Sequence, residues 1–219
     1  MTALVWDTPE EINYEKGVEK GVIYNAIQDI ELWTTLSIFG KAAAWPGLVS
    51  VTESDPDAGV TEVFLDGRKT FNQRNRGEYA CEISAFSIPK EFASIAGYAS
   101  PRPGFILTGQ PRSRFHFSYQ TRVNKNDYKL HLVYNASLVT SSFGSETIAD
   151  AVTPNVLSWS VSTMPPFPEY PGFSVSSHIV IDSRKVNPDI MPLIHEVLYG
   201  TEETPPWMPP PLVFLNLTP

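Results

Sequence analysis

The chain has 219 residues, of which 42% are hydrophobic and 18% are charged, enough apolar material for a folded core. A net charge of −8, from 16 basic and 24 acidic residues, argues against a protein that binds nucleic acid through a basic face. With Cys81 as its single cysteine, the chain can form neither an internal disulfide nor a thiolate-cluster zinc site.

Residues 1–13 lack the basic start and the apolar segment of a secretory signal. The apolar stretches stop well short of the ~20 residues that a membrane-spanning helix needs. We therefore expect a soluble protein made inside a cell, with no membrane partner. No linker and no internal repeat divides the sequence, which predicts one domain over 1–219, with an N-terminal arm at 1–16 and a Pro-rich extension at 204–219.

Apolar and polar residues alternate with a period of two through much of the chain, a pattern typical of strands with one buried face. Turn-forming residues separate these segments, as at 55–59 and 66–67. The pattern predicts strands at 21–24, 48–53, 61–66, 78–86, 114–123, 128–135, 157–162 and 177–182.

The clearest pair of strands is an antiparallel hairpin, in which a polar loop at 124–127 joins 114–123 to 128–135. The first strand alternates so that its predicted core face carries Phe115, Phe117, Tyr119, Thr121 and Val123. The second strand presents to the core Tyr128, Leu130, Leu132 and Tyr134. The opposite faces are predicted to be exposed to solvent.

Two segments are predicted to be helical. Asn187 is a good N-cap, and the apolar spacing after it is helical as far as Gly200, although Pro192 should distort the helix just past its first turn. A shorter helix is predicted within 87–97, with Phe92 facing the core. The elements together indicate a mostly β protein, an antiparallel β-sandwich or barrel with one or two flanking α-helices.

No catalytic motif emerges from the sequence. It contains no GxSxG elbow, no phosphate-binding loop and no dinucleotide fingerprint. Cys81 falls on the buried face of a predicted strand, which favours a small core residue over a nucleophile. A glycosidase pair among the many carboxylates stays open but has no supporting motif. We therefore expect neither enzyme activity nor a cofactor.

The four histidines do not form a recognisable metal-binding motif, because none has a second ligand at a spacing such as H-x-x-x-H. Three of them occupy outward positions of predicted strands, from which they could converge on one metal ion. We prefer the interpretation that they are solvated or hydrogen-bonded surface residues, and we expect no metal site. The four are His116, His131, His178 and His195.

Charges are segregated in the first half of the chain. Between the predicted strands at 61–66 and 78–86 lie the basic residues Arg68, Lys69, Arg74 and Arg76. In and beside the preceding turn lie the acidic residues Glu53, Asp55 and Asp57. A solvated hairpin loop explains this pattern, and so does head-to-tail pairing of copies, which generates rings and stacked filaments. We take these residues as candidates for a subunit interface.

The composition is also compatible with an interface. Aromatic residues make up 12% of the chain and charged residues 18%, against the ~25% charged residues of an average globular protein. Aromatic enrichment and charge depletion are typical of interface cores, but an ordinary sandwich core has the same effect on composition. Both explanations stay open.

Several short segments, in the same order along the chain, resemble the tail tube (major tail) subunits of long-tailed bacteriophages of actinobacteria. The matching segments are 17–24, 44–51, 64–69, 82–92, 110–136, 158–159, 178–182 and 198–201. Each segment alone is weak, and their colinear order carries the resemblance. The sequence departs from the pattern in the length of 25–43 and in the Pro-rich tail after Thr204.

The resemblance implies a tail-tube-like β-sandwich subunit that assembles with itself into hexameric rings. The rings would stack into a hollow tube in the virion, made in the cytoplasm of a bacterial host, through which the genome leaves. Its partners would be copies of itself and the tape-measure, tail-terminator and distal-tail proteins. DNA would pass without specific binding, and carboxylates facing the lumen would repel its phosphates.

Two other kinds of protein remain as alternatives. A tube-end, distal-tail or neck component would form a single ring and would not elongate. A carbohydrate-binding sandwich would need aromatic side chains aligned on a solvated face, whereas most aromatic residues here occupy inward positions of the predicted strands.

Overall fold

Antiparallel strands dominate the computed structural model of the protein, which describes residues 15–25, 42–54, 60–65, 68–74, 78–123, 125–142, 144, 154–164 and 176–215. Within these ranges no helix is long and apolar enough to cross a membrane. The elements in chain order are β1 (Lys16–Asn25), β2 (Ala42–Ala44), β3 (Leu48–Ser54), β4 (Val60–Leu65), β5 (Arg68–Arg74), β6 (Ala80–Ala85), α1 (Phe92–Ala96), β7 (Phe115–Arg122), β8 (Tyr128–Ser142), β9 (Leu157–Thr163), β10 (His178–Asp182), α2 (Ile190–Tyr199) and α3 (Pro211–Leu215).

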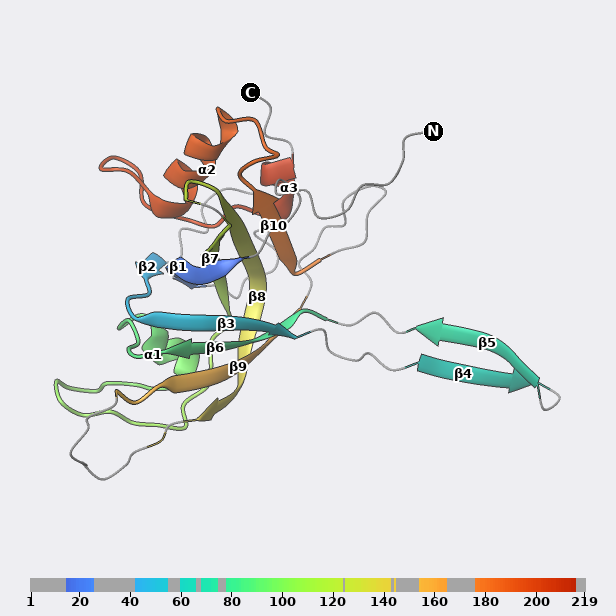
Figure 1. The fold of residues 1–219 in the computed structure, drawn as a ribbon. Helices are drawn as coiled ribbons and strands as arrows, with labels where there is room; N and C mark the ends of the chain where they lie inside the picture. Colours follow the sequence, from blue (N-terminus) through green and yellow to red (C-terminus); the bar gives the residue numbers. More distant parts are fainter. Residues whose placement is uncertain are drawn as a thin grey trace.

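Eight of the strands form one sheet in the order β2-β1-β7-β8-β9-β6-β3, with β10 paired to β8, and Figure 1 shows how strongly this sheet bends. All of these pairs are antiparallel. The mostly β, antiparallel fold with a few short helices is therefore confirmed, as is the predicted hairpin, which is β7–β8.

The bend of the sheet is set by the long strand β8 and by the short link between β2 and β3. The first half of β8 pairs with β7 and the second half with β9. The register shifts near Asn135, whose φ is +52°, as expected for a bulge that turns a strand. On the other side, Trp45 N donates to Gly21 O at 2.7 Å, which holds the β2–β3 link against β1.

An aromatic cluster fills the inside of the bend. The Trp45 ring lies 4.9 Å from that of Phe92 and 5.5 Å from that of Trp159, between ring centroids. Helix α1 supplies Phe92 to this cluster, as predicted, and ends at Gly97 with a left-handed φ of +76°. A Cβ at Gly97 would lie 2.5 Å from Gln110 O, so the turn requires glycine.

A second core lies on the other face of the sheet, which for β7 is the face that the sequence pattern predicted to be exposed to solvent. Helix α2 covers this face, and its Ile194 and Leu198 pack with Leu130 and Leu132 of β8. Every residue of β7 from Phe115 to Thr121 is therefore buried, and the prediction of a half-buried strand is wrong. The alternation of apolar and polar residues predicts a strand, but it does not predict which faces of that strand other elements will cover.

Helix α2 begins later than predicted. Asp189 is its N-cap residue, and the Asn187 side chain instead accepts a hydrogen bond from Asp189 N at 3.1 Å. Pro192 consequently falls in the first turn, where its missing N–H has no intrahelical partner to lose, so the predicted distortion does not arise. The helix ends at Gly200, whose φ is +75°.

The Pro-rich tail packs on its own chain. Trp207 N donates to Val197 O at 3.0 Å, and Pro209 O accepts a hydrogen bond from the buried Tyr134 hydroxyl at 3.0 Å. Met208 joins the second core beneath α2. The part of the tail that the structure describes, as far as 215, thus completes the cover of the outer sheet face.

Strands β4 and β5 form a separate two-stranded hairpin, which extends away from the eight-stranded sheet in Figure 1. Arg68, Lys69 and Arg74 lie on β5, so the prediction that these basic residues occupy a loop between strands is wrong. Leu65 of β4 and Arg68 of β5 are already paired, so the chain reverses earlier than that prediction assumed.

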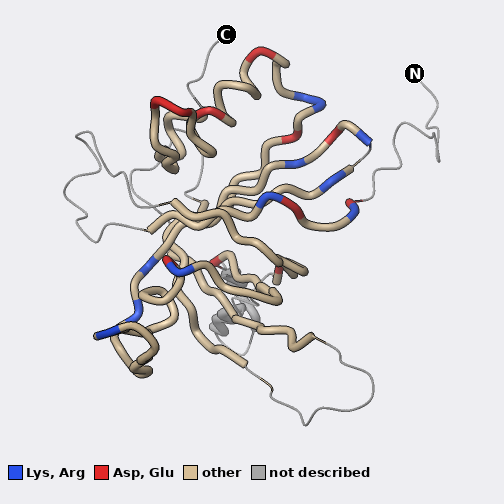
Figure 2. The backbone as a smooth tube through the Cα atoms, turned by 90° about the vertical axis from the view of Figure 1, so that its left-hand side faces the viewer, with Lys and Arg blue, Asp and Glu red and all other residues tan. Residues whose placement is uncertain are grey.

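Charged residues gather at the ends of the strands and in the helical region, as Figure 2 shows. Arg122 of β7 donates to both carboxylate oxygens of Glu19 on β1, at 2.6 and 3.0 Å. Arg184 makes a similar pair with Asp182 at the end of β10, which lowers the pKa of Asp182 to about 2. Such surface pairs contribute little stability and mainly mark the solvated rim of the fold.

Candidate functional site

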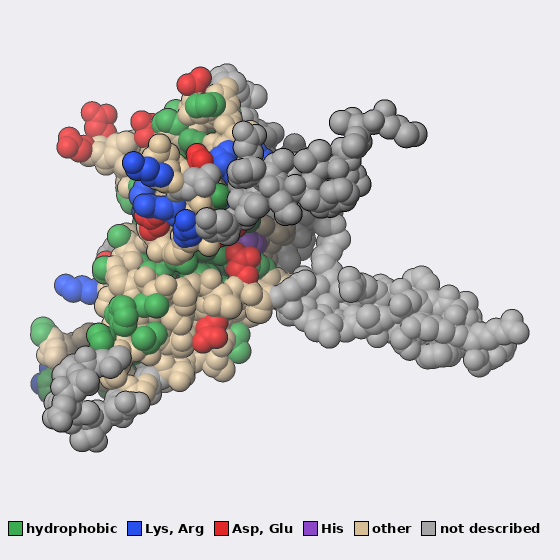
Figure 3. Space-filling model, viewed as in Figure 1, with side chains coloured by type: hydrophobic (Ala, Val, Ile, Leu, Met, Phe, Trp, Pro, Cys, Tyr) green, Lys and Arg blue, Asp and Glu red, His purple; other side chains and the backbone are tan. Residues whose placement is uncertain are grey.

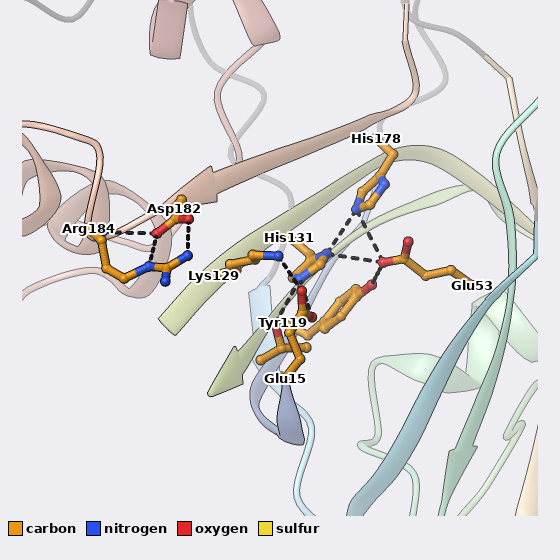
Figure 4. Close-up of polar contacts among 9 residues, drawn as sticks. Glu15, Glu53, Tyr119, Lys129, His131, His178, Asp182 and Arg184 are labelled. Carbon is orange, nitrogen blue, oxygen red and sulfur yellow. Dashed lines mark hydrogen bonds and ion pairs between the residues drawn. The ribbon is translucent and has the colours of Figure 1, made fainter. Parts of the chain in front are cut away.

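A cluster of Glu53, His131 and His178 is the only group of potential metal ligands found among the described residues. The three side chains come from β3, β8 and β10, and Figure 4 shows them pointing toward one another. In the β8–β10 pair, His178 lies opposite Val133 and is therefore diagonal to His131 on the same face. Glu53 reaches them from β3, across the bend of the sheet.

The donor atoms of the three side chains are close together. His131 Nδ1 lies 3.1 Å from His178 Nε2 and 3.1 Å from Glu53 Oε1. His178 Nε2 lies 3.7 Å from the same carboxylate oxygen. The Tyr119 hydroxyl donates to Glu53 Oε1 at 2.6 Å.

Aromatic rings and hydrogen bonds fix the two imidazoles. Tyr119 stacks on His131 with centroids 4.4 Å apart, and Tyr79 lies 4.1 Å from His178. The second ring nitrogen of His131, Nε2, is 3.0 Å from Thr121 Oγ1.

Burial controls the charge of the cluster. His131 is only 4% exposed, and burial lowers the pKa of both imidazoles, that of His178 to about 4. Burial also raises the pKa values of Tyr79 and Tyr119 well above the ordinary value, so both hydroxyls keep their protons. Near neutral pH the two imidazoles of the site are therefore uncharged.

The cluster lies at the root of the β4–β5 hairpin. Glu53 is the next-to-last residue of β3, the strand that leads toward the hairpin, and Tyr79 directly precedes β6, the strand that follows it. Ser54 and Ala80 are paired in the β3–β6 ladder, so the two ends of the hairpin segment are neighbours.

The sequence-predicted interface residues are not brought into one site within the described part of the chain. Glu53 belongs to the histidine cluster, while three of the basic residues lie on β5. Their pairing between copies stays a prediction. Outside the described residues lie Asp55, Asp57 and Arg76.

The prediction of solvated or hydrogen-bonded surface histidines, made for His116, His131 and His178, is wrong for His116 and His131, which are buried, whereas His178 is partly buried. His131 and His178 face the inner side of the sheet, and His116 is buried on the outer side beside Tyr134. Val133, two residues after His131, was the available signal, because an apolar residue on the supposedly wet face indicates that this face is covered. Cys81 is buried as predicted, and burial raises the pKa of its thiol to about 12.

His116 gives the fold a pH dependence. Its Nδ1 accepts a hydrogen bond from Asn135 N at 3.0 Å, and burial lowers its pKa from 6.5 to about 4. The unfolded chain then binds the proton more readily than the folded chain between these values, so stability is full above pH 6.5 and falls as the pH drops toward 4. We expect a loss of about 2 kcal/mol from this residue between pH 7 and pH 5.

Urea unfolding at the two pH values, on the wild type and on His116→Gln, measures this contribution. The variant keeps a neutral polar side chain and should lose about 2 kcal/mol less than the wild type on acidification. An equal loss in both proteins would show that His116 is not the group that titrates.

A comparison with protein-family models and with curated proteins finds no match for this chain. The resemblance to tail tube subunits is therefore carried by the quoted sequence segments alone.

Proposed function

We propose that the chain is a structural subunit of a bacteriophage tail tube, which assembles with copies of itself into stacked rings and performs no catalysis. Two features support a self-assembling protein. One is a hairpin that pairs with no further strand among the described residues, and the other is a set of exposed apolar side chains on the rest of the chain. The sequence resemblance supports the tail tube in particular.

The hairpin is the observation that carries the proposal. Among the described strands, β4 and β5 pair only with each other. A two-stranded hairpin is marginally stable at best in water when nothing packs against it. A neighbouring copy that covered the hairpin would stabilise it. The hairpin carries the basic residues Arg68, Lys69 and Arg74, which would be complementary to an acidic surface on that copy.

Exposed apolar side chains on the body support the same conclusion. Three consecutive residues of the loop after α1 are half exposed or more: Phe105 at 50%, Ile106 at 70% and Leu107 at 51%. A backbone pair between Ala99 and Leu107 holds this loop in place. In the view of Figure 3, hydrophobic side chains also reach the surface in the lower half of the body. Contiguous apolar surface of this kind is typical of contact sites.

Among the described residues, the carbohydrate-binding alternative receives no comparable support. Trp45 and Trp159 are buried in the inner core and cannot stack on a sugar ring.

The net charge of −8 is compatible with a DNA conduit, since carboxylates facing a lumen would repel the phosphates and let DNA slide.

Negative-stain electron microscopy of the purified chain, with light scattering for mass, tests the proposal. We expect hollow tubes or stacked rings at high protein concentration, because the hairpin and the apolar loop are then covered by neighbours. Single rings that never elongate would favour the tube-end component. A chain that stays monomeric at every concentration and binds sugars would contradict the proposal.

A further inference from the structure

We propose that Glu53, His131 and His178 bind a divalent transition-metal ion, with zinc as the best-fitting metal. Two imidazole nitrogens and one carboxylate oxygen are a donor set that zinc and its neighbours in the first transition row take readily. The site includes Glu53, an interface candidate, but ion binding is measured on the single chain, so the proposal is tested independently of the proposed function.

The spacing of the donor atoms suits a tetrahedral ion. Zinc binds nitrogen and oxygen at about 2.0–2.1 Å, which places two ligand atoms of a tetrahedron about 3.3 Å apart. The three donor separations in the cluster are 3.1, 3.1 and 3.7 Å. Side-chain shifts of a few tenths of an ångström therefore seat an ion between all three, with no movement of the strands.

The side chains that hydrogen-bond to the three proposed ligands are of the kinds that orient metal-binding side chains in proteins. His131 would bind through Nδ1 while Nε2–H donates to Thr121 Oγ1, 3.0 Å away, and Glu15 Oε2 lies 3.8 Å from the same nitrogen. A hydroxyl or carboxylate on the second ring nitrogen fixes the tautomer and makes the imidazole a better ligand. The Tyr119 hydroxyl occupies one lone pair of Glu53 Oε1 and leaves another for the ion.

The cluster is accessible from solvent and leaves one coordination position for a further ligand. The Glu53 side chain is 44% exposed, so the carboxylate side of the cluster opens to solvent, while the imidazoles are held inside. Three protein ligands leave the fourth tetrahedral position to water.

A bound ion would join parts of the sheet that the backbone leaves unpaired. β3 ends the strand order on one side, and β10 pairs only with β8 among the described strands. Glu53 on β3 and His178 on β10 would share the ion, and β3 leads directly toward the β4–β5 hairpin. The ion would thus fix the root of the hairpin to the body.

The test uses the full-length chain, stripped of metal with a chelator and titrated with zinc in a calorimeter and with cobalt by visible absorption. We expect one ion per chain, a cobalt spectrum of a four-coordinate nitrogen–oxygen site, and a rise in melting temperature on adding zinc. His178→Ala should weaken binding about 100-fold or more and abolish the rise. His195→Ala, which removes a histidine on α2 outside the cluster, should bind as the wild type does.

Glu53→Gln guards against a misfolded histidine variant, because the Glu53 side chain is partly exposed and the amide oxygen of glutamine can still accept from Tyr119. It should fold as the wild type does and bind zinc far more weakly. The proposal is overturned if the wild type binds no stoichiometric ion. It is also overturned if Glu53→Gln and His178→Ala bind as tightly as His195→Ala does, which would place the ion elsewhere.

Discussion

Replacing the β4–β5 hairpin, residues 56–77, with a short Gly-Ser linker is expected to abolish tube growth and to leave the body folded. The strands on either side stay paired without the hairpin, because Ser54 lies opposite Ala80 in the β3–β6 ladder. A linker of a few residues spans this gap. A shorter loop also lowers the entropic cost of bringing β3 and β6 together. The free energy of unfolding of the eight-stranded sheet and its helices should therefore rise by about 1 kcal/mol.

Negative-stain microscopy and a thermal melt measure the two halves of this expectation on the same sample. The melt should match or slightly exceed that of the wild type, and the grids should show single rings or separate subunits in place of tubes. Tubes of normal length from the hairpin-less protein would contradict the role given to the hairpin and remove the main support for the proposed function.

A pair of charge variants then separates the charge of the hairpin from its shape. Arg74→Glu with Arg76→Glu keeps the hairpin but reverses the charges predicted to meet an acidic surface, so stacking should be lost. Lys125→Glu reverses one charge in the exposed β7–β8 loop and serves as the matched control. If the double variant stacks normally, the hairpin acts through backbone pairing or apolar contact and not through its charges.

Local patterns were sufficient to predict most strands of the fold. The β7–β8 hairpin follows from alternation on both sides of a polar loop, and α1 follows from apolar spacing closed by Gly97. Both depend on residues that are near in sequence, where backbone preference and turn chemistry act directly.

The pairing of faces could not be predicted in the same way. Tyr119 lies opposite His131 and faces the inner core, whereas Leu130 and Leu132 face α2 on the other side. The apolar sets that looked like one shared core are thus on opposite faces of the sheet. Only the later helix α2, packed back over β7 and β8, makes both faces dry.

The candidate metal site depends on the same long-range arrangement. His131 and His178 are neighbours because β10 returns to pair with β8, and Glu53 reaches them because the sheet bends β3 toward β8. None of these three residues has a second potential metal ligand at a recognisable spacing in the sequence, so no spacing motif could have identified the site. The covered position of Val133 was the one local hint that His131 is not on the surface.

Two phenylalanine variants are expected to separate the folding core from the assembly surface. Phe92 is fully buried, with its ring 4.9 Å from Trp45 and 5.1 Å from Trp159, so Phe92→Ala leaves a cavity among large rigid rings. Such truncations cost about 3–5 kcal/mol, a large share of the 5–15 kcal/mol that hold a typical domain together. Urea unfolding should show this loss directly.

Phe105→Ala should behave in the opposite way. Its side chain is 50% exposed, and its ring centroid lies 3.8 Å from Cζ of the Arg102 guanidinium. Truncation should therefore lower the free energy of unfolding by only about 0.5–1 kcal/mol. If a neighbouring copy covers this loop, the same truncation removes a buried aromatic contact from every subunit, and light scattering should show assembly only at much higher protein concentration. Wild-type assembly by Phe105→Ala would exclude this loop from the interface, and a loss of stability equal to that of Phe92→Ala would place the loop in the core. The two variants together thus test whether the apolar loop serves the fold or the assembly.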